Sequence, residues 1–226
     1  MQEWELLGHV DHTLLTPTAT WAQIEALCRE GIQYKTASVC IPSCYVGRAA
    51  RAFGDQIPIC TVVGFPLGYE TTEAKAAQTR QALEEGASEI DMVINLCHVK
   101  NGDFDRVKQE IGTLKQIVGD QILKVIVEAC YLDEGEKIAM CRAVTEAGAD
   151  YIKTSTGFGT GGATLSDVEL FAKHIGENVK IKAAGGIRSL EQMEAFLEAG
   201  ASRIGSSSAV KLVREYENRG QERRTP

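Results

Sequence analysis

The stretch Ile122-Leu-Lys-Val-Ile-Val127 is almost entirely aliphatic, which is typical of a β-strand that is covered on both faces. Similar short runs alternate with longer helical stretches along the chain. We expect strands at residues 8–13, 34–40, 58–64, 88–95, 122–128, 150–154, 179–184 and 203–205. Helices are expected near residues 20–30, 43–53, 71–85, 102–118, 134–147, 166–176, 189–199 and 207–217. Strands that are each followed by a helix predict a parallel sheet closed into a barrel, the α/β fold called the TIM (β/α)8 barrel.

Length and charge set the broad class of the protein. The 226 residues suit such a barrel as a single domain, and no linker or shift in composition divides them. We expect the barrel to occupy residues 1–216 and a polar, flexible tail to occupy 217–226. The formal net charge of −7 argues against broad nucleic-acid binding, which needs a basic surface, but allows a local basic pocket for an anion.

The cysteines and the apolar segments indicate where in the cell the protein is expected. No apolar run approaches the roughly 20 residues of a membrane span, and the acidic first residues do not resemble a signal peptide. The seven cysteines are scattered without a CxxC pair, and the four histidines have no metal-ligand spacing with them. We therefore expect a cytoplasmic protein with reduced thiols, no metal site and no membrane partner.

A five-residue pattern, Gly-Ala-(Ser/Asp)-x-Ile, starts at residues 86, 148 and 200, each time where a helix leads into a strand. The residues that follow the three isoleucines are Asp91, Lys153 and Gly205. Alternate strands of a barrel contribute side chains to the same interior layer, so Asp91 and Lys153 should point inward at one level, opposite Gly205. Chance similarity is the alternative, because Gly-Ala is favoured after any helix.

Charged residues also occupy other strand positions where a core is expected. Lys180 and Lys182 alternate with aliphatic residues that must pack against helices, so both lysines should face the barrel interior. Lys124 and Glu128 share a face of their strand in the same way. Such side chains are almost never buried unless they are paired. For Lys180, Lys124 and Glu128 a structural network of ion pairs in the barrel floor is the favoured interpretation.

Lys153, Lys182 and Asp91 are more strongly expected to be functional, with structural ion pairs as the alternative. Both lysines precede polar or glycine-rich loops, near the barrel end where catalytic residues lie. Two ammonium groups on strands about 4.8 Å apart repel each other, and an enclosed site disfavours charge, so we expect one lysine to have a lowered pKa. A neutral lysine forms a Schiff base with a carbonyl, and the iminium makes or breaks the adjacent carbon–carbon bond. Asp91 is the expected partner for proton transfer.

The loops after the last two strands predict an anion site. Glycines follow the strand at 179–184, and a Gly-Ser-Ser-Ser segment opens the last helix, which is the usual position of a barrel phosphate site. Ordinary turn chemistry is the alternative. The expected substrate and phosphate ligands are Thr156, Gly157, Gly185, Gly186, Arg188, Gly205, Ser206 and Ser207.

Two further residues are candidates for lining the pocket. Cys40 shares a face with Thr36 and Ser38, although an inert buried thiol is the favoured interpretation. Asp11, near the end of its strand, either holds a lysine in place or pairs structurally. His12 has no partner serine or cysteine signature, so a catalytic triad is unsupported.

Six blocks of the sequence resemble the deoxyribose-phosphate aldolase family, and the resemblance as a whole covers about residues 9–213. The two most specific are Lys153-Thr-Ser-Thr-Gly157 and Lys182-Ala-Ala-Gly-Gly-Ile-Arg188. The others are Asp11-His-Thr-Leu-Leu15, Ser38-Val-Cys-Ile-Pro42, Cys60-Thr-Val-Val-Gly-Phe-Pro66 and Asp91-Met-Val-Ile-Asn95.

This resemblance implies an aldolase that reversibly cleaves 2-deoxy-D-ribose 5-phosphate to D-glyceraldehyde 3-phosphate and acetaldehyde, without a metal or an organic cofactor. It implies that Lys153 forms the Schiff base, that Lys182 lowers the pKa of Lys153 and helps proton transfer, and that Asp91 donates and accepts protons through water. Some members end in a tyrosine that assists proton transfer. This chain ends with Arg223-Arg-Thr-Pro226, so we expect the proton step to rely on Asp91, Lys182 and water.

Two alternatives stay open at this point. A related barrel aldolase for another sugar phosphate would offer hydrogen-bond partners to a hydroxyl at carbon 2. A catalytically silent phosphosugar-binding barrel would keep the glycine loops but would need no neutral lysine. A homodimer or larger homo-oligomer is expected as an assembly, without a feature of the sequence that fixes its size.

Overall fold

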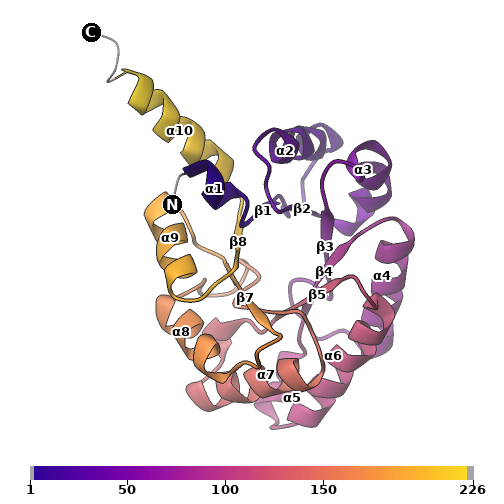
Figure 1. Cartoon of the computed structure of the whole chain (residues 1–226). Helices are drawn as coiled ribbons and strands as arrows, with labels where there is room; N and C mark the ends of the chain where they lie inside the picture. Colours follow the sequence, from indigo (N-terminus) through magenta and orange to yellow (C-terminus); the bar gives the residue numbers. More distant parts are fainter. Residues whose placement is uncertain (1–2, 223–226) are drawn as a thin grey trace.

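The computed structural model describes residues 3–222, and in it eight parallel strands close into a barrel in chain order (Figure 1). Each strand pairs with the next along the chain, and the last pairs with the first. The prediction of a TIM barrel is therefore confirmed. The strands are β1 (Val10–Thr13), β2 (Ser38–Ile41), β3 (Ile59–Val63), β4 (Glu89–Val93), β5 (Ile122–Ile126), β6 (Tyr151–Lys153), β7 (Lys180–Ala184) and β8 (Arg203–Ser206).

Helices surround the strands as an outer ring (Figure 1). Those that follow the strands are α2 (Trp21–Gln33), α3 (Val46–Phe53), α4 (Thr72–Glu84), α6 (Phe104–Val118), α7 (Glu134–Glu146), α8 (Leu165–His174), α9 (Leu190–Glu198) and α10 (Ala209–Glu222). The sequence analysis missed three short helical segments, namely α1 (Glu3–Leu7), α5 (Leu96–Lys100) and the 3-10 turn η2 (Ala129–Tyr131). The helix expected at 43–53 begins as a second 3-10 turn, η1 (Ser43–Tyr45), and continues as α3.

The chain after the barrel differs from the expected tail. The last helix runs to Glu222 rather than ending near 217, so the first part of the segment expected to be flexible is helical. Residues 223–226 lie outside the described residues. Within the described part of the chain, no helix has both the length and the apolar character that crossing a bilayer requires.

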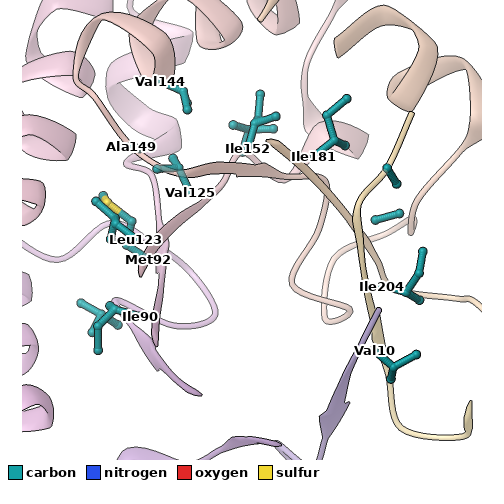
Figure 2. Close-up of a cluster of buried hydrophobic side chains, with 14 of the residues drawn as sticks. Val10, Ile90, Met92, Leu123, Val125, Val144, Ala149, Ile152, Ile181 and Ile204 are labelled. Carbon is teal, nitrogen blue, oxygen red and sulfur yellow. The ribbon is translucent and has the colours of Figure 1, made fainter. Parts of the chain in front are cut away.

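The main apolar core lies between the strands and the helices. Figure 2 shows Ile90 and Met92 of β4, Leu123 and Val125 of β5, and Ile152 of β6 on the outer side of the strands. All five side chains are buried. Successive strand residues point to opposite faces, so Asp91, Lys124 and Lys153 must point to the barrel axis. The apolar outer face thus fixes which charged residues enter the interior.

The position of Lys180 corrects one expectation. This lysine is exposed, whereas Lys182 is fully buried. Lys180 is the first residue of β7, at the end of the barrel opposite to the cavity described below. Its ammonium lies 5.9 Å from the centre of the Tyr151 ring. The alternation of the strand was predicted correctly, but an end residue does not have to be enclosed.

Candidate active site

A cavity of about 240 Å³ opens where the strands end. Four of its lining residues, Thr13, Lys153, Ala184 and Ser206, are the last residues of β1, β6, β7 and β8. The cavity therefore lies at the C-terminal end of the barrel, where TIM-barrel enzymes place their chemistry. The other lining residues are Leu14, Leu15, Thr16, Thr156, Gly157, Phe158, Gly185, Gly186, Ile187, Gly205 and Ser207.

Asp91 is the centre of a buried ion-pair network below this cavity. One of its oxygens, Oδ1, accepts a hydrogen bond from Lys124 at 2.7 Å. The other, Oδ2, accepts from both Lys153 at 2.8 Å and Lys182 at 2.6 Å. The structure thus brings together the three residues that the sequence singled out as functional. It also adds a feature that the sequence analysis did not foresee, because a carboxylate lies between the two lysines.

Asp11 holds Lys182 from the other side. Its Oδ2 contacts Lys182, and it lies 3.5 Å from the ammonium of Lys124. Its Oδ1 accepts hydrogen bonds from the hydroxyl of Ser38 at 2.7 Å and from Arg203. Asp11 is fully buried and is not among the residues that line the cavity. Its place is therefore beneath the site, where it fixes the position of one lysine.

Glu89 and Arg203 complete the network, and the sequence analysis missed both of them. Glu89 lies 2.5 Å from Lys124 and 3.2 Å from Arg203. A usable signal was present, since Glu89 is two residues before Asp91 and Arg203 is two residues before Gly205. The period of two along a strand places residues i and i+2 on the same face.

Counting charges shows why Lys153 differs from its neighbours. The network contains four cationic side chains and three carboxylates, which leaves one positive charge in excess: Lys124, Lys153, Lys182 and Arg203 face Asp11, Glu89 and Asp91. Of the four cationic side chains, Lys153 is the one that lines the cavity, so it is the one that a substrate bound there can meet.

The other charged groups are held firmly in their ionised forms. Burial alone would raise the pKa of Asp91, but Lys124, Lys153 and Lys182 outweigh it and hold that pKa well below its usual value. Burial alone would lower the pKa of Lys182, but Asp11 and Asp91 raise it above its usual value. Lys182 therefore stays an ammonium group at neutral pH, and Asp91 stays a carboxylate.

The free energy of unfolding should be highest over a broad neutral range and fall on both sides of it. The folded-state pKa of Asp91 is depressed, so its contribution is present above the unfolded value of about 3.9 and is lost as the pH falls below that value. The folded-state pKa of Lys182 is raised, so its contribution is present below about 10.4 and is lost as the pH rises further. Urea unfolding between about pH 2 and 11 measures the fall in the free energy of unfolding on the acid side (the acid limb) and on the alkaline side.

A matched control for this pH dependence is Asp150→Asn. Asp150 pairs with Lys115 near the surface, where an ion pair contributes little, so this variant should show the same acid limb as the unmodified protein. Carbon-13 spectra of the side-chain carboxyl groups give a direct readout. If Asp91 titrates near pH 4 while the protein is still folded, the acid limb has a different origin.

Cys40 and Cys60 lie side by side below the cavity rather than in its wall. They are register partners on β2 and β3, and both are fully buried. Burial raises the pKa of Cys60 well above its usual value, while the hydrogen bond from Cys60 lowers that of Cys40. Cys40 is not among the residues that line the cavity, so the less favoured of its two interpretations, that it lines the pocket, is wrong.

The two thiols and Asp91 also place three potential metal ligands within 4.8 Å of one another. The ammonium of Lys124 already occupies this position. It lies 2.7 Å from Asp91 Oδ1 and 3.3 Å from the sulfur of Cys60. A metal ion would have to displace a buried lysine, so this cluster fits an ammonium group better than it fits a metal.

Most of the expected phosphate ligands surround the cavity, and one does not. Gly157, Gly185 and Gly186 have φ values of 86°, 86° and 74°, a left-handed conformation that glycine adopts without steric cost. Arg188 is exposed and is not among the lining residues. The structure brings the remaining expected ligands to the cavity: Thr156, Gly157, Gly185, Gly186, Gly205, Ser206 and Ser207.

Gly205 leaves room for Lys182. A Cβ atom at position 205 would lie 3.2 Å from Cε of Lys182 and 2.8 Å from Cβ of Ala184. The repeated Gly-Ala-x-x-Ile pattern predicted a position without a side chain at this level of the barrel. The close approach gives that prediction a physical reason.

Known proteins show the same architecture and a closely similar sequence. The model of the DeoC/LacD family of aldolases matches residues 6–211. A deoxyribose-phosphate aldolase of Clostridium botulinum (strain Alaska E43 / Type E3) is 62% identical over 220 residues, which cover 97% of this chain and 100% of the relative. One of Clostridioides difficile (strain 630) is 54% identical over 209 residues, which cover 92% and 95% of the two chains.

A solved structure agrees with these sequence matches. The deoxyribose phosphate aldolase of Aeropyrum pernix, described as a unique tetrameric structure, superimposes with a TM-score of 0.87 at 32% sequence identity. The superposition covers 96% of this chain and 92% of the other.

Proposed function

The chain belongs to the DeoC/LacD family of aldolases, and from this premise we propose the steps by which it reversibly cleaves 2-deoxy-D-ribose 5-phosphate to D-glyceraldehyde 3-phosphate and acetaldehyde. One observation supports the assignment of the chemistry above the others. Lys153 lines the cavity and is hydrogen-bonded to Asp91, which a second, permanently charged lysine also contacts.

Lys153 is the proposed nucleophile. Its neutral amine attacks the aldehyde carbon, C1, and loss of water gives a protonated Schiff base. The C2–C3 bond then breaks as the hydroxyl on C3 loses its proton, and the bonding electrons flow to the iminium nitrogen. D-Glyceraldehyde 3-phosphate leaves with C3 to C5. Protonation of the remaining enamine at C2 and hydrolysis of the Schiff base release acetaldehyde.

Asp91 is the proposed proton-transfer group, and Lys182 assists it. Asp91 is an ionised carboxylate 2.8 Å from Lys153, so it takes up a proton from Lys153 only transiently and passes it to water in the cavity. Lys182 bonds the same oxygen of Asp91 and remains charged, which favours the negative charge of that carboxylate. Water in the cavity would carry protons between these groups and the substrate.

The glycine and serine loops are the proposed phosphate site. Gly185 and Gly186 follow β7, and Ser206 and Ser207 lie just before α10. Backbone N–H groups at a helix start favour an anion. A phosphate bound there would hold the sugar with its other end directed to Lys153, which lines the same cavity.

Borohydride trapping tests this function. Incubation with acetaldehyde and borohydride should add an ethyl group to Lys153, which peptide mass spectrometry detects. Lys180, exposed on the neighbouring strand, is the internal control and should stay unlabelled. If no lysine carries an adduct, the silent phosphosugar-binding barrel is the better description. D-Ribose 5-phosphate, offered as a second substrate, distinguishes an aldolase for another sugar phosphate.

Assembly and location belong to the same proposal. We propose a homo-oligomer, supported by the tetramer described for the Aeropyrum pernix relative. Light scattering at several protein concentrations measures its size, and a monomer at all of them would contradict it. The cytoplasmic location stays a prediction that cell fractionation tests.

A further inference from the structure

Glu128 occupies an unusual place at the edge of the site. The sequence analysis assigned it to ion pairs in the barrel floor, but the structure places it just past the end of β5, beside the loop that follows Lys153. The residue is 2% exposed. The described residues include no salt bridge to Glu128, so its expected place in a network of ion pairs is wrong.

The carboxylate of Glu128 accepts hydrogen bonds from both donors of Thr156. Its Oε1 accepts from the backbone N–H of Thr156 at 3.1 Å, and its Oε2 accepts from the hydroxyl group of the same residue. The oxygen of that hydroxyl accepts from the backbone N–H of Phe158 at 3.0 Å. Thr156 was expected to bind phosphate, yet neither of its donors is free to do so. Its neighbour Gly157 lines the cavity and has a backbone N–H that can.

The backbone around Glu128 is built to keep this arrangement. Glu128 has φ 49°, a left-handed conformation that is uncommon for a residue with a side chain and persists where the surroundings fix it. Backbone bonds on either side hold it, from Val127 to Lys153 at 3.0 Å and from Ala129 to Thr154 at 2.8 Å.

The loop also packs closely over the carboxylate. A Cβ atom at Gly159 would lie 3.2 Å from Oε1 of Glu128, so a larger residue there would push the two apart. Beside the loop is a second, smaller cavity of about 60 Å³, lined by Glu128, Thr156 and Phe158 among others. This cavity is a space into which the loop can shift if the hydrogen bonds to Glu128 are lost.

We infer that Glu128 is a positioning residue for the phosphate end of the substrate. By binding both donors of Thr156 it fixes the loop so that the N–H of Gly157 is presented to the phosphate in the main cavity. The inference rests on the proposed function, because it concerns the phosphate group of that substrate. Glu128 does not touch the reacting atoms and acts through Thr156.

Steady-state kinetics with 2-deoxyribose 5-phosphate and with unphosphorylated 2-deoxyribose test this role. Glu128→Gln and Thr156→Val each disturb the hydrogen bonds and nearly preserve the size of the side chain. We expect each to raise KM for the phosphorylated sugar about 10-fold, the effect of one lost hydrogen bond to a charged group, with little change in kcat. KM for the unphosphorylated sugar should not change. Thr156→Ser keeps the hydroxyl group, so its KM for the phosphorylated sugar should stay close to that of the unmodified protein.

Further measurements separate the outcomes. Glu134→Gln changes an exposed acid of α7 and is the matched control for the loss of charge. Inorganic phosphate, used as a competitive inhibitor, should bind about 10-fold more weakly to Thr156→Val. This variant tests the inference even if Glu128→Gln does not fold. Equal effects on both sugars, or no effect on either, would overturn the inference. A failure of acetaldehyde trapping at Lys153 in the unmodified protein would instead overturn the proposed function.

Discussion

Replacing Lys153 with leucine is expected to remove turnover, with a loss of at least roughly 10⁴-fold in kcat, because the covalent intermediate can no longer form. The protein should still fold. Asp91 keeps its hydrogen bonds to Lys124 and Lys182, so no buried carboxylate loses all of its partners. The substitution also removes the one excess positive charge of the network, so the melting temperature should stay the same or rise. Turnover assays and thermal unfolding measure the two effects.

The matched control is Lys180→Leu. It removes a lysine from the adjacent strand at an exposed position and should leave turnover unchanged. Binding of inorganic phosphate should persist in Lys153→Leu, since the glycine and serine loops are untouched. Full activity in Lys153→Leu would remove the assignment of the nucleophile. A large drop in its melting temperature would show that the buried charges do not balance in the way described.

The interior of the barrel could be predicted because strands have a period of two. Ile90 and Met92 pack outward, so Asp91 between them must point inward, and the same alternation places Lys124 and Lys182. The period says nothing about how far along the barrel axis a residue lies. Lys180 obeys the alternation and is nevertheless exposed, because it begins its strand.

The repeated helix-to-strand turns were predictable for a local reason. Gly86, Gly148 and Gly200 each adopt a positive φ, of 102°, 74° and 114°. This conformation after a helix favours glycine, so the pattern marks the same turn three times. Because the turns are alike, the strands after them start at comparable levels, which is why Asp91 and Lys153 meet.

The polar contacts of the loops could not be predicted. Glu128 bonds to Thr156, which is 28 residues away, and nothing in either segment of sequence indicates the other. The left-handed conformation of Glu128 occurs without a glycine or asparagine to signal it. Cavity residues such as Leu14 and Leu15 have no chemical signature, and only the closure of β1 onto β8 brings them to the site. Contacts of this kind depend on the tertiary fold.

Replacing Lys182 with methionine is expected to lower kcat roughly 100-fold and to move the pH optimum to a more alkaline value. In the unmodified protein, Asp91 Oδ2 is shared between Lys153 and Lys182. Without Lys182, the charge of Asp91 is balanced by Lys124 and by the ammonium form of Lys153. Lys153 then retains its proton to higher pH, and less of the reactive amine is present near neutrality. The pH profile of kcat/KM measures the shift.

The direction of this shift separates two roles for Lys182. If Lys182 only supported the fold, Lys182→Met would reduce the melting temperature and the amount of active enzyme, but the pH profile of the remaining activity would keep its shape. If Lys182 sets the charge that Asp91 offers to Lys153, the profile itself must move. Asp11 keeps Ser38 and Arg203 as partners in this variant, so its carboxylate is not left alone. An unchanged profile would therefore show that the two lysines are not coupled through Asp91.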